Sequence, residues 1–443
     1  MKTLRLTSWQ RIAATLFCAA VLLSCGGGGS SQPPPAAPVI LQQPTSTSAK
    51  AGGTATFSVG ASDSSSVSYQ WLRNGVNIAG ETKARLELSP VWLLESGAAF
   101  SVVVANAAGS VSSNQATLTA TSPALTIIAG VQVTPGNFPV DYVDATGSNA
   151  RFNGVGSIAV DDDGNVYAIA ALSIRKVTPE GVVTTFAGSR NRDGWVDGNG
   201  ANARFGFLGD LMFDRSRRVL LVTDGVGSTS LVREITLAGD VTTRSSTPAP
   251  EGIIKFGADG TVYYSGGNVR LPAQIDIEQS AVYRSLATGP AQLLAGDPDV
   301  REFKDGVPGQ ARFRHITALA ADGNGNVYVA DDHSIRRISA DGSVTTVAGS
   351  STTTGTPVDG VGAAADFSSI QGLYVERSGS LLFTDRNLVR RVTPAGRVTT
   401  IANSSTQNFG LRLALDGTGM LYASGPFWVG RFEPIAPGLA DPR

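Results

Sequence analysis

The sequence predicts an all-β protein in which a small β-sandwich precedes a six-bladed β-propeller. The main observation is a phrase that returns after residue 120: an apolar strand, an Asp/Gly turn, a second strand, an Ile-Arg-basic segment and a Val-Thr-Thr strand. Before residue 120, short strands and turns follow a different pattern. No long stretch carries the 3.6-residue apolar period of an amphipathic helix. A repeat of this kind fixes the architecture before any residue is given a role.

The repeat returns often enough to build a closed ring. Its turn position is occupied by Gly164, Arg217, Gly260, Gly325, Gly379 and Gly419. Each unit has roughly the length of one blade, since four short strands with their turns need about 40 to 50 residues. The last unit lacks its Val-Thr-Thr strand, whereas residues 125–130 form such a strand with no unit in front of it. We therefore expect residues 125–130 to close a propeller over 124–436, followed by a tail at 437–443, because closure removes exposed sheet edges.

The repeated phrase, with its long loops ending in Ala-Arg-Phe, resembles the NHL repeat, a family of six-bladed β-propellers. The first, fourth and fifth units carry the resemblance most specifically. The second unit has Arg217 at the turn position, and the third runs through PAQIDIEQSAVYRS without the Ile-Arg-basic segment. The resemblance implies a ring whose loops on one face bind ligands.

The first 25 residues resemble a bacterial lipoprotein signal. Basic residues precede an apolar run over 12–23, which is too short for a membrane-spanning helix. The run ends in Leu-Leu-Ser-Cys, and resemblance to the lipobox implies that Cys25 is lipidated; the plainer alternative is an ordinary cleaved signal. Residues 26–37 then form a Gly/Ser/Pro tether. Since Gly26 is not the Asp associated with inner-membrane retention, we expect a lipid anchor in the outer membrane of a Gram-negative cell envelope, facing the periplasm or the outside.

The segment 38–120 is predicted to be a separate β-sandwich. Its short strands are parted by turns, and the spacing of Val59, Trp71 and Val102 resembles an immunoglobulin-like domain in which two valines replace the disulfide pair. Phe100 stands at the tyrosine-corner position without the hydroxyl.

Composition narrows the class of partner. The chain has 443 residues, enough for these two domains and little more, and 35 basic against 36 acidic residues give a net charge of -1. This balance argues against a nucleic-acid partner. No motif for a cofactor, a catalytic serine or a phosphate-binding loop occurs, so we expect no cofactor, and we expect a monomer.

Four long loops between blades share a phrase and are expected to emerge on one face. They span 141–152, 193–205, 304–313 and 358–367. Residues that repeat in them are expected to pack the blades, with arginines paired to carboxylates: Phe152, Phe205, Phe313, Phe367, Arg151, Arg204 and Arg312. Carboxylates that end second strands are likewise expected to pair with third-strand arginines: Asp224 with Arg233, Asp331 with Arg336 and Asp385 with Arg390. The candidate ligand-binding residues are those that do not repeat: Tyr142, Arg192, Trp195, His315 and His333.

A metal site is the weaker alternative. Propellers similar to this one include lyases and lactonases that set His and carboxylates around a metal. Only His315 and His333 exist here, and with a carboxylate such as Asp331 they could complete a three-ligand site. The plain alternative is two polar loop residues.

The sequence thus favours a surface or periplasmic lipoprotein that acts as a binding or adhesion module. A rigid propeller would display loops that contact a protein or glycan ligand. A metal-assisted lyase or lactonase remains an alternative, as does an envelope-assembly scaffold whose sandwich is the contact surface. No catalytic residue is assigned.

Overall fold

The structure is a computed structural model of the chain. It describes residues 36–51, 53–62, 67–89, 91–132, 141–226, 229–248, 253–257, 261–266, 280–285, 291–376, 378–403 and 412–433. The predicted signal with Cys25, most of the predicted tether and the predicted tail lie outside these residues.

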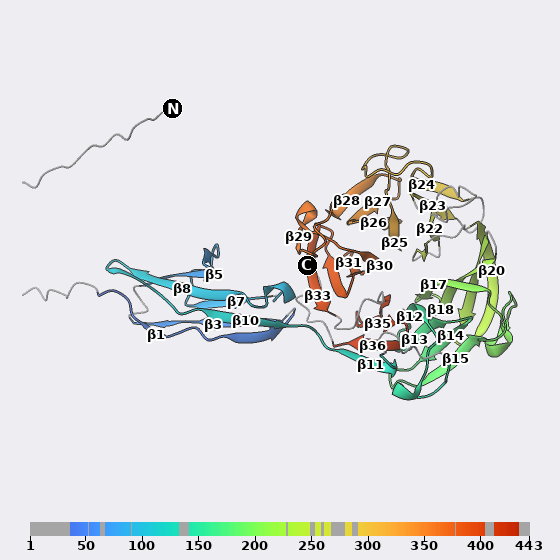
Figure 1. The fold of residues 1–443 in the computed structure, drawn as a ribbon, viewed down its shortest axis with the longest axis horizontal. Coiled ribbons are helices and arrows are strands. Elements are labelled where there is room, and N and C mark those ends of the chain that lie inside the picture. The colour runs from blue at the N-terminus through green and yellow to red at the C-terminus, as the bar shows by residue number, and fades with distance from the viewer. Residues whose placement is uncertain are drawn as a thin grey trace, which may run out of the picture.

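The described chain is all-β and has two bodies, an elongated sandwich and a ring of sheets (Figure 1). Its helical segments are short 3-10 turns: η1 (Leu93–Glu95), η2 (Gly147–Asn149), η3 (Gly200–Asn202) and η4 (Gly362–Ala364). The predicted fold class, an all-β protein with a propeller, is confirmed.

The sandwich is built from short strands in three hydrogen-bonded sheets. Its strands are β1 (Ile40–Gln42), β2 (Thr47–Lys50), β3 (Ala55–Ser58), β4 (Gly60–Ala61), β5 (Ser68–Arg73), β6 (Val76–Asn77), β7 (Arg85–Leu88), β8 (Ala99–Asn106), β9 (Gly109–Ser112) and β10 (Ala116–Thr121). The largest sheet has the order β2-β10-β8-β5-β6, with β9 on β8, while β3 pairs with β7 and β1 with β4.

The core of the sandwich forms around Trp71. This side chain is fully buried, shares its cluster with Val59 and Val102, and donates its indole N–H to the Lys83 carbonyl at 2.8 Å. Phe100 stacks on another buried ring at 4.8 Å between centroids, so its contribution is apolar where a tyrosine would add a hydrogen bond.

Six sheets of four or five strands form the ring. Blade 1 holds β12 (Val155–Val160), β13 (Val166–Ala170), β14 (Ser173–Val177) and β15 (Val183–Gly188). Blade 2 holds β17 (Phe207–Asp214), β18 (Val219–Val226), β19 (Thr229–Thr236) and β20 (Asp240–Pro248), with β16 (Gly198–Asn199) on its outer edge. Blade 3 holds β21 (Ile254–Phe256), β22 (Val262–Gly266), β23 (Ala281–Ser285) and β24 (Gln292–Gly296).

The second half of the ring repeats this order. Blade 4 holds β25 (Ile316–Ala321), β26 (Val327–Asp331), β27 (Ser334–Ile338) and β28 (Val344–Gly349). Blade 5 holds β30 (Ile370–Val375), β31 (Leu381–Asp385), β32 (Leu388–Val392) and β33 (Arg397–Asn403), with β29 (Gly360–Val361) on its outer edge. Blade 6 holds β34 (Arg412–Leu415), β35 (Leu421–Gly425) and β36 (Trp428–Phe432), and β11 (Leu125–Gly130) supplies its outer strand.

The ring is closed by strands from opposite ends of the propeller. β11 pairs antiparallel with β36, from Leu125 opposite Phe432 to Gly130 opposite Trp428, as the strand pattern predicts. The first and last segments of the ring therefore share one sheet, which hides an edge that would otherwise be free to pair with other chains.

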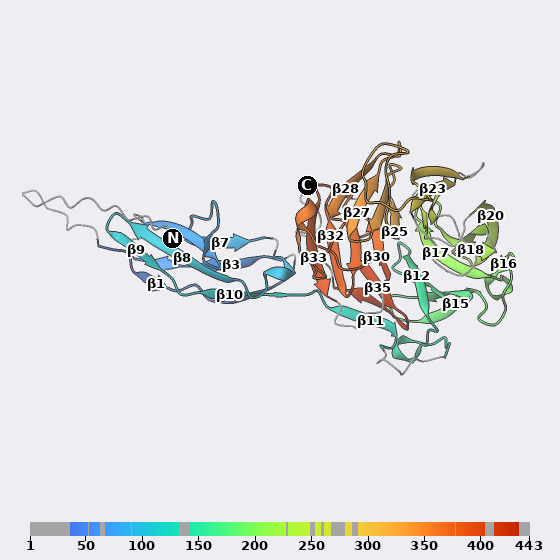
Figure 2. The same ribbon diagram turned by 45° about the horizontal axis from the view of Figure 1, so that its top comes forward.

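The sandwich touches the propeller next to this closure (Figure 2). Lys50 forms an ion pair with Glu433 at 2.7 Å, and the Asn403 backbone N–H donates to the Ser122 hydroxyl at 3.1 Å. Trp92, just before η1, packs against the apolar cluster shared by blades 5 and 6. These contacts join the sandwich to the ring by packing as well as by the connecting chain.

Candidate functional site

One face of the ring carries all four repeated loops. Each loop leads from the outer strand of one blade to the inner strand of the next, so the loops emerge at the end where inner strands begin. We call this end the loop face. Each loop also returns to the outer strand of the blade that it enters, through the pairs Thr146 with Val182, Gly198 with Val241, Gly306 with Val344, and Gly360 with Val398.

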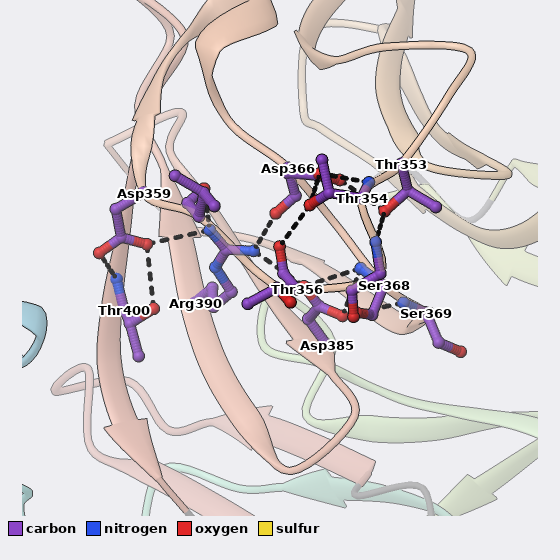
Figure 3. A network of polar contacts seen from close by, with 12 residues as sticks. Thr353, Thr354, Thr356, Asp359, Asp366, Ser368, Ser369, Asp385, Arg390 and Thr400 are labelled. Atoms are coloured by element: carbon purple, nitrogen blue, oxygen red, sulfur yellow. Dashed lines mark hydrogen bonds and ion pairs between the residues drawn. The ribbon is translucent and has the colours of Figure 1, made fainter.

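A network of buried charges fixes each loop, and blade 5 shows it most completely (Figure 3). The Arg390 guanidinium donates to Asp385 at 2.8 Å and to Asp359 at 3.0 Å. Asp359 lies in the loop and also accepts the backbone N–H of Thr400 at 2.7 Å. Asp385 accepts the backbone N–H of Ser369 at 2.9 Å. One arginine thus ties the second strand, the outer strand and the loop together.

Blades 2 and 4 repeat the network. Arg233 pairs with Asp224 at 2.7 Å and Asp197 at 3.0 Å, and Arg336 pairs with Asp331 at 2.8 Å and Asp305 at 2.7 Å. The cross-strand pairs predicted from sequence are confirmed. Their burial exceeds expectation, because each arginine and its strand-end aspartate are fully buried, so removing one partner would leave an unpaired charge inside the protein.

Burial and hydrogen bonding act in opposite directions on these carboxyl groups. Burial raises the pKa of Asp224, despite hydrogen bonds from two backbone N–H groups and from Arg233. Burial also opposes ionisation of Asp197, but hydrogen bonds from Thr243 and the charge of Arg233 lower its pKa below the ordinary value. The loop carboxylate therefore carries its charge at neutral pH.

The four repeated phenylalanines are buried, as predicted: Phe152, Phe205, Phe313 and Phe367. The prediction that the neighbouring arginines all pair with carboxylates is wrong. Arg151 donates to the carbonyls of Ser148 and Ala150, and Arg204 likewise donates to carbonyls of its own 3-10 turn. Arg312 does the same and adds an ion pair with Asp297 at 3.2 Å. The 3-10 turns η2 and η3 end two residues before Arg151 and Arg204, so the carbonyl oxygens of each turn lie within reach of the arginine side chain.

In blade 1, Tyr142 covers the arginine of a network that lacks one carboxylate. Ala170 stands where blades 2, 4 and 5 have the strand-end aspartate. The Tyr142 ring covers the Arg175 guanidinium, with 4.0 Å from its carbon to the ring centroid, as Phe303 covers Arg336 in blade 4. The Tyr142 hydroxyl lies 2.6 Å from the Ser173 hydroxyl. The ring and hydroxyl of this candidate ligand-binding residue are therefore occupied by contacts that hold blade 1 together.

Blade 2 presents apolar side chains on the loop face. Trp195 is 50% exposed although its indole N–H donates to the Gly225 carbonyl at 3.0 Å. A Cβ at Gly206 would lie 2.4 Å from the indole nitrogen, so the ring lies directly on this glycine. Phe207, the first residue of β17, is 75% exposed, and Val196 is 51% exposed. We call Trp195, Val196 and Phe207 the blade-2 ledge.

Of the ledge residues, sequence reasoning identified Trp195 and missed Phe207. An apolar residue that begins an inner strand looks like core, and only the departure of unit two from the repeat could have drawn attention to it. Arg192, another candidate, is exposed on the loop that carries Trp195.

The two histidines lie together in blade 4. The His315 ring is 55% exposed, and its Nδ1 lies 3.7 Å from the Asp332 carboxylate. Nδ1 of His333 is buried and has no hydrogen-bond partner among the described atoms. Burial, together with the charge of Asp331, raises the pKa of Asp332 despite the nearby basic side chains of both histidines and Arg314.

Asp331 has a different set of partners. Its carboxylate accepts hydrogen bonds from Arg336 and from the backbone N–H groups of Arg314 and His315. No group of three or more His, Cys, Asp or Glu side chains suited to a metal ion occurs among the described residues. The structure brings the histidines to one carboxylate, Asp332, while Asp331 belongs to the blade network.

No protein-family model matches the chain, and no curated protein matches its sequence. Among solved structures, a Bacteroides thetaiotaomicron protein of unknown function is 15% identical, with 91% of this chain and 100% of that chain covered and a TM-score of 0.48. An auxiliary nutrient binding protein of the same organism is 13% identical, with 91% and 99% covered and a TM-score of 0.47. A gluconolactonase of Xanthomonas campestris is 12% identical, with 70% and 100% covered and a TM-score of 0.42. At these values the likeness carries no information on ligand or activity.

Within the described ranges, no helix has the length and hydropathy needed to cross a bilayer.

Proposed function

We propose that this protein is a binding module that captures a protein or glycan ligand on the blade-2 ledge. The observation that carries the proposal is the exposed pair of aromatic side chains, Trp195 and Phe207, on a face whose loops are fixed by buried ion pairs. Large aromatic side chains contribute most of their binding free energy when a partner covers them, and here half of Trp195 and three quarters of Phe207 remain uncovered.

The ledge is also pre-organised. Trp195 is held by a hydrogen bond to the Gly225 carbonyl and by contact with Gly206, so little side-chain freedom is left to lose on binding. Asp197, two residues after Trp195, is bound to Arg233 and Thr243. The same loop therefore holds the aromatic ring on one side and a buried network on the other.

The wider setting of this module is part of the same proposal. The propeller is of NHL type, the sandwich is an immunoglobulin-like spacer, and Cys25 carries the lipid that anchors both to the outer membrane of a Gram-negative cell. The anchor rests on the sequence alone, and mass spectrometry of the N-terminal peptide tests it. No observation on the described residues favours the lyase, lactonase or scaffold alternatives.

The test is a binding screen with the full chain against a glycan array and immobilised envelope proteins. We expect Trp195→Ala and Phe207→Ala each to weaken capture at least about tenfold, as loss of a central aromatic contact does, with the melting temperature nearly unchanged. Leu293→Ala is the matched control, because Leu293 is 51% exposed but lies on the outer strand of blade 3. Capture that is unchanged by both ledge substitutions would contradict the proposal.

A further inference from the structure

A second polar cluster lies at the axis of the ring, on the inner strands. Ser157, Asp210 and Arg412 occupy the same position in blades 1, 2 and 6, since each directly precedes the residue that pairs with the centre of the second strand. Two positions further along their own strands stand Lys255 in blade 3 and Tyr374 in blade 5. Alternate residues of a strand share a face, so all five side chains belong to the same face of the inner strands.

These residues are not needed to build the ring. Three blades carry Ile253, Ala318 or Gly372 at the first of these positions. At the second position the other blades carry uncharged side chains: Ala159, Met212, Ala320 and Ala414. Because apolar or small residues serve at the first position in three blades and at the second position in four, the polar residues are not explained by blade packing.

Direct contacts connect the cluster across the ring. Oδ1 of Asp210 accepts a hydrogen bond from Nζ of Lys255 at 2.6 Å and one from the Ser157 hydroxyl at 3.0 Å. Nζ of Lys255 lies 5.7 Å from the centroid of the Tyr374 ring. The Tyr374 hydroxyl accepts the backbone N–H of Leu413, next to Arg412, at 3.2 Å. Five inner strands thus meet at one set of polar groups.

The groups that remain unused are mainly donors. Lys255 gives one of its three N–H bonds to Asp210, and Arg412 forms no ion pair with any described residue. Burial would lower the pKa of Lys255, but Asp210 raises it above its ordinary value, so the ammonium stays charged at neutral pH. The charge of Arg412 acts on the Lys255 ammonium, so two cations share the cluster with one carboxylate, Asp210. Oδ2 of Asp210 accepts no hydrogen bond from a described residue. The cluster has an excess positive charge and one free acceptor.

We propose that this axial cluster binds a carboxylate-bearing sugar. The ligand carboxylate would accept hydrogen bonds from Arg412 and from the remaining N–H groups of Lys255, while a sugar hydroxyl would donate to Oδ2 of Asp210. Charge-assisted hydrogen bonds of this kind are short and strong. The site is separate from the blade-2 ledge, and the inference does not depend on the function proposed there.

The test is isothermal titration of the full chain with sodium D-glucuronate and with D-glucose at equal ionic strength. We expect glucuronate to bind at least about tenfold more tightly than glucose, and Arg412→Gln to weaken glucuronate binding by about tenfold or more, as loss of a hydrogen bond to a charged group does. Arg397→Gln is the matched control, because Arg397 is also exposed and unpaired among the described residues but lies on the outer strand of blade 5. It should leave binding unchanged.

Titrations of a ledge variant and with inorganic sulfate separate this site from the blade-2 ledge and a sugar ligand from a simple anion. Trp195→Ala should leave glucuronate affinity unchanged, so loss of the ledge function cannot be mistaken for loss of this site. Glucose binding equal to glucuronate binding, no binding of either, or equal losses in the two arginine variants would overturn the proposal. Inorganic sulfate that binds as tightly as glucuronate and is lost with Arg412→Gln would overturn the assignment to a sugar.

Discussion

Repeated and unrepeated positions of the ring have different environments. The arginines of the third strands, which recur in four blades, are fully buried and bound on several sides: Arg175, Arg233, Arg336 and Arg390. Trp195 and Phe207 are half or more exposed, and Lys255 and Arg412 keep N–H groups that donate to no other described residue. In this ring the repeated positions hold the blades together. The residues that were set apart as unrepeated have mixed environments, since Trp195 is half exposed whereas Tyr142 packs on Arg175 and holds blade 1 together.

A closer comparison is between blades 4 and 1, where one network is complete and the other has lost a carboxylate. Arg336 is held by the fully buried Asp331 and by the loop residue Asp305. Arg175 keeps only the loop carboxylate. Both guanidinium groups lie under an aromatic ring of the loop, Tyr142 in blade 1 and Phe303 in blade 4. The two arginines occupy equivalent positions in their blades. Removal of Arg336 would leave a fully buried carboxylate unpaired, whereas removal of Arg175 would leave a partly exposed one.

The largest expected effect follows from that difference. Arg336→Met should destabilise the protein by about 3 to 5 kcal/mol, because it leaves the buried Asp331 carboxylate without its cation. Arg175→Met should cost about 2 kcal/mol, because its carboxylate partner is 43% exposed and can be hydrated. Urea unfolding of both variants measures the gap.

Arg337→Met is the control for the first substitution, since Arg337 is the exposed neighbour of Arg336 on the same strand. It should change stability by no more than about 0.5 kcal/mol. Equal losses of stability in Arg336→Met and Arg175→Met would contradict this prediction, because they would show that the buried Asp331 carboxylate does not increase the cost of removing its arginine.

A smaller effect tests the repeated contact between strand ends and loops. Gly349 has a φ of 82°, and a Cβ there would lie 2.3 Å from the His333 carbonyl oxygen and 2.6 Å from the Phe367 ring. Gly349→Ala should therefore cost about 3 kcal/mol from backbone strain and overpacking together. Gly355 has a similar φ of 81° but no atom within 4 Å of its Cβ position. Gly355→Ala should cost only about 1 kcal/mol. Thermal unfolding compares them, and a matching shift in melting temperature would exclude the crowding at Gly349.

The sequence predicted the parts of this molecule that repeat. The closing strand at 125–130, the buried phenylalanines and the Arg–Asp pairs all follow from positions that recur at one place in each unit. The carbonyl partners of Arg151 were not predictable, because they depend on a 3-10 turn that the repeated sequence pattern does not indicate.

The candidate site was predictable only in part. Trp195 was identified from the sequence, although the equivalent loop position is also aromatic in Tyr142 and Phe303. The exposure of Phe207 could not be predicted, because an apolar residue at the start of an inner strand is expected to be buried. The packing of Tyr142 on Arg175 could have been predicted only by aligning the loops, since Phe303 packs on Arg336 in the same way. The axial pair joins Lys255 and Asp210, which are 45 positions apart and share no motif. Such contacts can be predicted only when the strand register and the placement of all blades around the ring are known.

The smallest expected effect concerns the unrepeated carboxylate between the two histidines. Burial raises the pKa of Asp332 above its ordinary value, so ionising it costs more in the folded chain than in the unfolded chain. At pH 7 the ionised group therefore lowers stability, and this cost disappears as the pH falls and the group takes up its proton. Asp332→Asn should stabilise the protein at pH 7 by less than about 1 kcal/mol, because Asn tolerates the φ of 51° found there. In urea unfolding between pH 7 and pH 4, the difference from the unsubstituted chain should shrink.

The sign of that effect has an internal control in the same blade. Hydrogen bonds from the backbone and hydroxyl of Ser343 lower the pKa of Asp341, so this carboxylate adds stability above its unfolded pKa and loses it as the pH falls. Asp341→Asn should therefore destabilise the protein at pH 7, opposite to Asp332→Asn. If both substitutions destabilise the protein at pH 7, the ionised Asp332 carboxylate between His315 and His333 stabilises the fold, as the loop carboxylates of the Arg–Asp networks do. Asp332 and the two histidines would then help to hold blade 4 together.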